Sequence, residues 1–284
     1  MPEEAKSFRA DAIRRITGDK VAVGSAIYIA CLILIATFAP LIAPYSYSFQ
    51  SVSEAYNGPS YTHWFGTDQL GRDILSRVIW GARVSISVGL GVTAITATVG
   101  VVVGVLSGFF GGWVDTTIMR LTDMVFAFPG ILFAILMMAI LGPSILNVFV
   151  ALSITHWAGI ARIVRSNVLS VKESEFVEAA RAMGARDKAI ILRHVLPQIM
   201  SPVIVSSTMN AGTFILSEAS LSFLGIGISP PFPSWGAMIA GATQNVLVYP
   251  YMIFFPSLGL AGLILAFNFL GDSLRDALDP RLKI

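Results

Sequence analysis

The side chains of this 284-residue chain that could do chemistry are few and widely separated. His63, His156 and His194 and the single cysteine, Cys31, share no metal-ligand spacing, so the sequence predicts neither a metal site nor a disulfide. Each histidine is expected to be structural or interfacial. The phosphate loop G-x-x-x-x-G-K-[ST] is absent, since Gly18-Asp19-Lys20 lacks the preceding glycine and the hydroxyl. We therefore expect no catalytic residue and no cofactor in this chain.

Residues 178–197 form the most informative polar segment, a charged and helix-prone stretch between long apolar runs. Ser174 can cap a helix that begins with an acidic turn, and Gly184 suits the left-handed residue that ends many helices. A second, basic helix then reaches Leu196-Pro197, where the proline breaks it or begins the next span. The first helix is expected to place apolar residues on one face and charged residues around the other: Phe176, Ala179, Ala180 and Met183 against Glu175, Glu178 and Arg181.

Two roles fit this helix–glycine–helix hairpin. The small alanines beside bulky Phe176 and Met183 suit insertion into the groove of a partner protein. The alternative is a basic loop beside the membrane that fixes topology and binds anionic lipid. A chain with no phosphate loop of its own would need a partner that supplies the energy, and this hairpin could be where that partner binds.

The composition is typical of an integral membrane protein. Charged residues make up 13% of the chain and apolar residues 55%, whereas soluble domains carry about 25% charged residues; the mean hydropathy is +0.75. A span needs about 20 apolar residues. Six segments qualify, at about 21–43, 84–107, 124–142, 145–164, 198–220 and 249–270. Only Gly142-Pro143-Ser144 separates the third from the fourth, which predicts a tight turn between antiparallel helices.

The distribution of lysine and arginine orients the chain. Six spans place both termini on one side, and sixteen of the 19 basic residues fall there, leaving only Arg72, Arg77 and Arg83 outside. The sequence therefore predicts cytoplasmic tails at 1–20 and 273–284 and a cytoplasmic loop at about 165–197. The first apolar run could be misread as a secretory signal, but it is longer than the usual 7–15-residue core. Because Pro40 and Pro44 also suit cleavage poorly, we expect a retained span.

Residues 44–81 are expected to form an extracytoplasmic loop before a core of 82–272. Apolar residues recur at helical spacing from Leu70 to Ala82, with charged and hydroxyl side chains opposite. This pattern indicates a helix lying in the outer interface; contact with an external substrate-delivery protein is the alternative. A later external loop, Ser229 to Gly236, contains three prolines, which forbid regular helix. It is either a structured turn or part of the outer closure of a pathway.

Inside the spans, small and polar residues mark two features. Glycines recur at every fourth position from Gly100 to Gly112 and predict a stripe against which another helix packs. The fifth span contains Asn210 and Glu218. Glu218 falls near the outer boundary, where it either contacts substrate or the outer gate, or is a solvated or hydrogen-bonded boundary residue. Asn210, Glu218 and Trp235 are therefore the candidate residues of the pathway or its gate.

Several motifs together resemble the permeases of bacterial ATP-binding-cassette (ABC) importers. Glu178-Ala179-Ala180, then three residues, Gly184, and Leu196-Pro197 resemble their cytoplasmic coupling motif, with His194 where an aliphatic residue is usual. The resemblance is strongest to the second, C-type permease of the dipeptide, oligopeptide and nickel subgroup. It covers roughly residues 20–284 and includes three further segments: 65–73, 225–236 and 271–280.

The resemblance implies an all-α, type I permease fold of six transmembrane helices, with a peripheral first span and a cytoplasmic coupling hairpin. It implies a second homologous permease subunit, one or two separate ATPase subunits that hold ATP and Mg²⁺, an extracytoplasmic substrate-binding protein, and a bacterial or archaeal inner membrane with both termini cytoplasmic. Membrane lipid is the other expected contact, and nucleic acid is not expected. The coupling residues would be Phe176, Glu178, Ala179, Ala180, Arg181, Met183, Gly184, Leu196 and Pro197.

The leading hypothesis is a permease subunit, without an ATPase site, that forms half of a pathway for di- or oligopeptides. Relatives in the subgroup also carry nickel chelates, glutathione or sugar-containing ligands. An autonomous channel or ion-coupled transporter would need intramembrane charge pairs or broken helices, and the sequence indicates neither. An intramembrane hydrolase would need a base facing a nucleophile, for which His156 is the candidate base. No motif identifies the residues that contact substrate.

Overall fold

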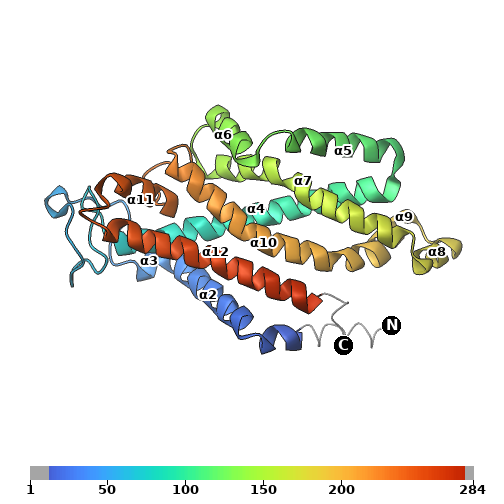
Figure 1. The fold of residues 1–284 in the computed structure, drawn as a ribbon, viewed down its shortest axis with the longest axis horizontal. Coiled ribbons are helices and arrows are strands. Elements are labelled where there is room, and N and C mark those ends of the chain that lie inside the picture. Colours follow the sequence, from blue (N-terminus) through green and yellow to red (C-terminus); the bar gives the residue numbers. More distant parts are fainter. Residues whose placement is uncertain (1–12, 279–284) are drawn as a thin grey trace.

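The computed structural model describes residues 13–278, whose regular structure is helical apart from one isolated bridge between Thr67 and Asp73. The long helices run along the longest axis of the molecule (Figure 1). Five are long and apolar enough to cross a membrane: α2 (Lys20–Thr37), α4 (Ile74–Phe110), α7 (Ile145–Lys172), α10 (Leu196–Phe223) and α12 (Tyr251–Leu278). The bent pair α5 (Gly112–Phe126) and α6 (Gly130–Leu141) makes a sixth if it counts as one span. The predicted all-α membrane fold is confirmed.

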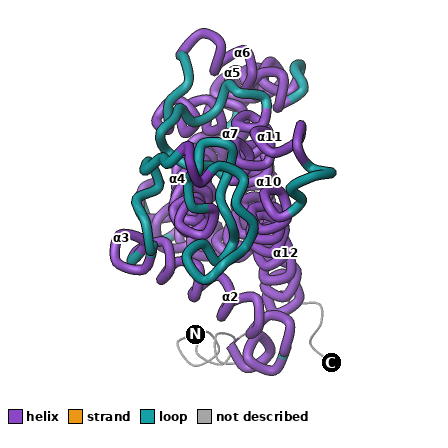
Figure 2. Tube along the Cα trace, turned by 90° about the vertical axis from the view of Figure 1, so that its left-hand side faces the viewer, coloured by secondary structure: helices purple, strands orange, loops and turns teal. Residues whose placement is uncertain are grey.

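Shorter elements gather at the two ends of this bundle. At one end α8 (Glu175–Ala182) and α9 (Asp187–Ile190) project, and α2 begins and α12 ends on the same side (Figure 1). The opposite end carries α3 (Ala39–Ile42), the long segment before α4, and α11 (Trp235–Ala242). Figure 2 looks onto that end and shows its loops lying over the helices. The remaining short turns are Val52–Glu54, Ile191–Val195 and Thr243–Asn245.

The start of α2 is tied to the end of α12. Asp19 caps α2 by accepting a hydrogen bond from the Val21 amide at 2.9 Å, and its Oδ2 accepts one from the Ser273 hydroxyl at 2.5 Å. The Ser273 hydroxyl, and after it the Val21 amide, hold the pKa of this carboxyl below its ordinary value, because both bonds favour the charged form. The peripheral first span is thereby fixed to the last one.

Helix α4 begins earlier than predicted. Asp73 is its N-cap, and Oδ2 accepts hydrogen bonds from the amide and the hydroxyl of Ser76, both at 2.7 Å. The helix then runs without a break from Ile74 to Phe110. The predicted boundary at residue 81 is therefore wrong, because the helix expected in the loop is the first part of α4. The polar face of that helix is not solvated, since Arg77 is 6% exposed and donates to the Tyr47 carbonyl oxygen in the loop that covers it.

The third predicted span, 124–142, is broken in the structure. Helices α5 and α6 meet at 86°. Pro129 has no amide to donate and disfavours helical geometry at the residue before it, so the hydrogen-bond ladder of α5 ends there. The expectation that no helix is broken is wrong at this point. The next turn is as predicted: Gly142 has φ +82°, and Ser144 caps α7 by accepting from the Asn147 amide at 3.3 Å.

Helices α4 and α7 approach closely along the predicted glycine stripe. A Cβ on Gly104 would lie 2.6 Å from the Ala161 carbonyl oxygen, and Gly100 and Gly108 are as crowded, at 2.6 and 2.9 Å from α7 side chains. Such close packing attracts helices in lipid, where the hydrophobic effect between them is small. Gly112 is not part of the stripe, because α4 ends before it and a Cβ there would meet nothing within 4 Å.

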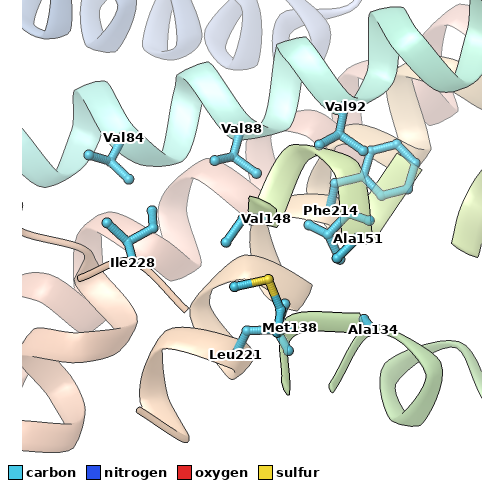
Figure 3. Close-up of a cluster of buried hydrophobic side chains, with 11 residues drawn as sticks. Val84, Val88, Val92, Ala134, Met138, Val148, Ala151, Phe214, Leu221 and Ile228 are labelled. Carbon is cyan, nitrogen blue, oxygen red and sulfur yellow. The ribbon is translucent and has the colours of Figure 1, made fainter. Parts of the chain in front are cut away.

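A buried apolar cluster joins α4 to three other elements nearer the loop-covered end (Figure 3). Val84, Val88 and Val92 follow one another along α4 and belong to one cluster with Met138 of α6 and Phe214 of α10. The other buried members are Ala134, Val148, Ala151, Leu152, Leu221 and Ile228. Helices α4, α6 and α7 and the second half of α10 therefore pack together around one buried cluster.

Replacing Gly104 with valine should destabilise the chain, because the new side chain would overlap the Ala161 carbonyl oxygen and Val164. Overpacking of this kind costs about 1–3 kcal/mol. Gly24→Val is the matched control, since it adds the same side chain to apolar helix α2 at a glycine with no neighbour within 4 Å. We expect a lower Tm in detergent for the Gly104 variant only; equal Tm values for the two variants would contradict the close approach.

Candidate functional site

The hairpin that contains α8 and α9 is anchored to the bundle at its base. Lys172, the last residue of α7, donates from Nζ to the Phe109 carbonyl oxygen of α4 at 2.5 Å. Ser174 occupies the predicted N-cap position of α8. Its side chain does not cap the helix as expected, because the hydroxyl donates to the Val171 carbonyl oxygen at 2.5 Å. The acidic residues of the first turn remain to stabilise the positive end of the helix dipole.

Helix α8 ends at Ala182, and Gly184 follows its C-cap residue in the predicted left-handed conformation, with φ +82°. The Gly184 amide donates to the Arg181 carbonyl oxygen at 2.9 Å and the Ala185 amide to the Ala180 carbonyl oxygen at 3.0 Å. These two bonds form a Schellman motif. A Cβ at Gly184 would meet nothing within 4 Å. The position therefore favours glycine for its backbone conformation and not for lack of space.

The face of α8 that is free for a partner differs from the predicted one. Val177 is fully buried in an apolar cluster with residues of α4, α7, α9 and α10, and Ala180 is 3% exposed. The prediction that Ala180 lies on a face offered to a partner is wrong, because the hairpin packs that residue against its own chain. Met183 is 82% exposed and Phe176 38% exposed. The other exposed residues of the predicted motif are Glu178, Ala179, Arg181 and Gly184.

The second arm of the hairpin continues into α10. A π-helical turn, Ile191–Val195, connects α9 to Leu196, the first residue of α10. In a regular α-helix the ring of Pro197 would crowd the Arg193 carbonyl oxygen. The wider π turn avoids this conflict. Of the two predicted outcomes, a break at Pro197 is not found, because one helix runs from Asp187 to Phe223 through the π turn and the proline. Pro197 lies in the first turn of α10, and its side chain is exposed, whereas Leu196 is half-buried. A displacement of α9 would act directly on α10.

The candidate pathway residues of α10 are not brought together. Asn210 is half-buried near the middle of the helix. Glu218 is completely buried, and its Oε1 accepts hydrogen bonds from the hydroxyls of Ser222 and Ser234 at 2.7 Å each. Of the two alternatives for Glu218, a hydrogen-bonded residue inside the chain fits this geometry, because its carboxyl ties α10 to the segment before α11.

Trp235 is also enclosed by the chain itself. It is 1% exposed, and its Nε1 donates to the Val78 carbonyl oxygen of α4 at 3.0 Å. A Cβ on Gly81 would lie 2.7 Å from the indole and one on Gly259 3.1 Å from it. Glycine at these two positions therefore makes room for the ring between α4 and α12. This packing favours the structured turn for the proline-containing loop that ends at Gly236.

The sequence analysis missed a buried polar cluster in the segment before α4. His63 Nδ1 lies 2.8 Å from Asp73 Oδ1, and the two residues are 6% and 4% exposed. Asp68 Oδ2 accepts a hydrogen bond from Arg72 Nε at 2.6 Å. The charges that suggested a solvated helix face are instead paired inside the loop. No group of three His, Cys, Asp or Glu side chains within residues 13–278 is arranged to hold a metal ion.

Comparison with known families agrees with this architecture. The family model described as "Binding-protein-dependent transport system inner membrane component" matches residues 100–284, which include the hairpin and α10. The chain belongs to this family. A second model, "N-terminal TM domain of oligopeptide transport permease C", matches residues 7–59 and so includes α2. The protein is a multi-pass permease subunit of an ABC importer, of the C type in the dipeptide and oligopeptide group.

Named relatives are similar over almost the whole chain. The "Glutathione transport system permease protein GsiD" of Escherichia coli O6:K15:H31 (strain 536 / UPEC) is 45% identical over 283 residues, which is 99% of this chain and 93% of the relative. The protein of the same name from Shigella boydii serotype 4 (strain Sb227) gives the same values. Membership of the permease family favours the permease hypothesis over the autonomous channel and the intramembrane hydrolase.

Solved structures show the fold. An inward-facing crystal form of the MetNI methionine ABC transporter contains a chain that superposes with a TM-score of 0.59 at 20% identity, covering 72% of this chain and 98% of that chain. A second crystal form gives a TM-score of 0.54 at 21% identity, over 72% and 96% of the two chains. The structure therefore has the predicted type I importer permease fold.

Glu218→Gln should leave stability close to that of the wild type, because the remaining carbonyl oxygen can still accept both serine hydroxyls. Glu218→Ala should lower the Tm, since it leaves two buried hydroxyls without their acceptor, at a cost of about 1–3 kcal/mol. Tm in detergent and substrate uptake would be measured together. Loss of uptake by Glu218→Gln at an unchanged Tm would show a role in the pathway in place of this structural one.

Proposed function

We propose that this chain forms half of the translocation pathway of an importer for short peptides, with glutathione among its substrates. The relatives named as glutathione transport permeases are 45% identical across nearly the whole chain, and this observation supports the substrate class. The match to the oligopeptide permease model supports the same class. In this proposal a second, homologous permease supplies the other half of the pathway, and an extracytoplasmic binding protein delivers the substrate.

The energy would come from separate ATPase subunits that bind ATP and Mg²⁺, and the hairpin would be the part of this chain that they contact. The observation that supports this contact is the exposure of Met183, whose apolar side chain is 82% exposed at the tip of a polar hairpin. Phe176, seven residues earlier at the start of α8, is 38% exposed. Both suit a shallow apolar groove on a partner. The positive charges beside them support a cytoplasmic location for this end of the bundle.

The geometry suggests how motion would pass through the chain. Val177 of the first arm and Ile190 of the second lie in one buried apolar cluster with residues of α4, α7 and α10, so the two arms and the ends of these helices would move together. Its second arm is continuous with α10 through the π turn. Closure of the ATPase subunits would therefore displace α10 against α4 and α7, and the pathway would open to alternate sides as the populations of the two states shift.

Gly184→Val should uncouple ATP hydrolysis from uptake while the transporter still assembles. Valine at φ +82° costs about 1–2 kcal/mol of backbone strain and disturbs the turn that orients Met183. Gly142→Val is the matched control, because Gly142 has the same φ, no neighbour within 4 Å, and lies at the other end of the bundle. Uptake and substrate-stimulated ATPase activity would be measured in proteoliposomes. Normal coupling in the Gly184 variant, or equal loss in both variants, would count against the hairpin's role.

Met183→Asp should weaken binding of the ATPase subunit by more than about tenfold, since it places a charge in an apolar contact. Leu247→Asp changes a residue that is 96% exposed at the opposite end and serves as the control. Binding would be measured by titrating purified ATPase subunit onto the permeases in nanodiscs. Unchanged affinity of the Met183 variant would contradict a contact at this residue.

The substrate class is tested by competition in the reconstituted transporter. Uptake of a labelled dipeptide should be inhibited by unlabelled glutathione and by other short peptides. Nickel chelates and oligosaccharides at the same concentration should not compete. Competition by a nickel chelate and not by any peptide would overturn the peptide assignment while leaving the coupling role intact.

A further inference from the structure

A small cavity of about 30 Å³ lies at the loop-covered end of the bundle. Four segments enclose it: the loop before α4, the first turns of α4, α11, and the start of α12. Its polar lining consists of Asp68, Gln69, Arg72 and Arg77. Its remaining walls are aliphatic side chains and a glycine: Ile74, Ala237, Met238, Gly241 and Met252. A space of this volume can hold a ligand the size of one or two water molecules.

The charged groups around the cavity do not balance. Asp68 is the only carboxylate among its lining residues, whereas both arginines line it. Asp68 Oδ2 accepts from Arg72 Nε at 2.6 Å and lies 3.8 Å from Arg77 Nε. The other Asp68 oxygen accepts from the amides of Leu70 and Arg72 at 2.9 and 3.1 Å. One carboxylate thus faces two guanidinium groups and is already bound by one of them.

Arg77 is therefore a buried cation that shares its carboxylate partner, Asp68, with Arg72. The residue is 6% exposed, and Nη1 donates to the Tyr47 carbonyl oxygen at 3.0 Å. Its Nε is buried and donates no hydrogen bond to any group in the described part of the chain. The carboxylate of Asp73 is hydrogen-bonded to His63 and Ser76. A buried charge is costly unless it is paired, so the site favours one additional negative charge.

We propose that this cavity is a binding site for a small monovalent anion, with chloride as its physiological ligand. Arg77 and Arg72 supply the positive charge, the Gln69 amide can donate a hydrogen bond, and the aliphatic walls suit a weakly hydrated ion. The volume excludes a nucleotide, a peptide or a lipid headgroup. Because the lining residues come from four segments, the bound anion would fasten the external loop to α11 and α12. It would thus stabilise the loop-covered end of the permease.

The first test is the dependence of stability on the anion. The assembled transporter in detergent would be heated in sodium chloride or sodium gluconate at matched ionic strength. We expect Tm to rise saturably with chloride, by about 2–4 °C, because the anion binds only the folded state. A Tm that does not differ between chloride and gluconate would overturn the proposal.

A designed counter-charge gives a sharper test. Gln69→Glu places a carboxylate beside the two arginines, so the variant in gluconate should reach the Tm of the wild type in chloride and lose its response to chloride. Gln244→Glu is the matched control, since Gln244 is exposed and does not line the cavity. It should keep the full chloride response. A chloride response retained by Gln69→Glu would show that the anion binds elsewhere.

The ligand can also be located directly. Crystals of the transporter grown in sodium bromide should give an anomalous peak between Arg77 and Gln69, measured at the bromine absorption edge. Density in the cavity without an anomalous peak would identify water and would contradict anion binding. This inference does not rest on the substrate or the coupling role, so failure of either leaves its tests unaffected.

Discussion

The close approach of α4 and α7 is the constraint on which the rest of the structure depends. In lipid the hydrophobic effect between apolar helices is small, so their attraction must come from short-range packing contacts. Gly104 provides such contact because any side chain there would meet the Ala161 carbonyl oxygen at 2.6 Å. With the two helices held together, the end of α7 reaches the end of α4, and Lys172 can donate to the Phe109 carbonyl oxygen. The base of the hairpin is therefore set by glycines far from it in the sequence.

The hairpin is rigid for reasons that are local. The Schellman bonds at Gly184 fix the turn, and Val177 and Ile190 give the two arms a shared apolar contact with the bundle. The π turn before Leu196 allows a proline to begin α10 without separating α10 from the hairpin. These features make the hairpin and the span parts of one mechanical element. An exposed apolar side chain at its tip, Met183, is then placed where force on the hairpin would be applied.

The sequence predicted those features whose cause lies within a few residues. The cap at Gly184, the turn at Gly142 and the glycine stripe are local consequences of residue type, and the structure contains all three. It did not predict features that depend on distant contacts. Ala180 lies at helical spacing from Phe176, but contact with the rest of the bundle decides which face is buried. The apolar residues on both sides of Pro129 favoured one continuous span at 124–142, but the helix is interrupted at this proline.

The charged residues before and at the start of α4 also depend on distant contacts, so the sequence did not predict their burial. Periodicity placed Arg77 on the polar side of a helix, and a polar side is normally solvated. The loop before α4 covers that side because its own backbone supplies acceptors, such as the Tyr47 carbonyl oxygen, and because Asp73 and His63 satisfy one another. Burial of this set leaves the Asp68 carboxylate shared between two guanidinium groups, those of Arg72 and Arg77. Two of the three basic residues on the proposed outer side, Arg72 and Arg77, are thus held by specific contacts, which offset the general preference for cytoplasmic arginine.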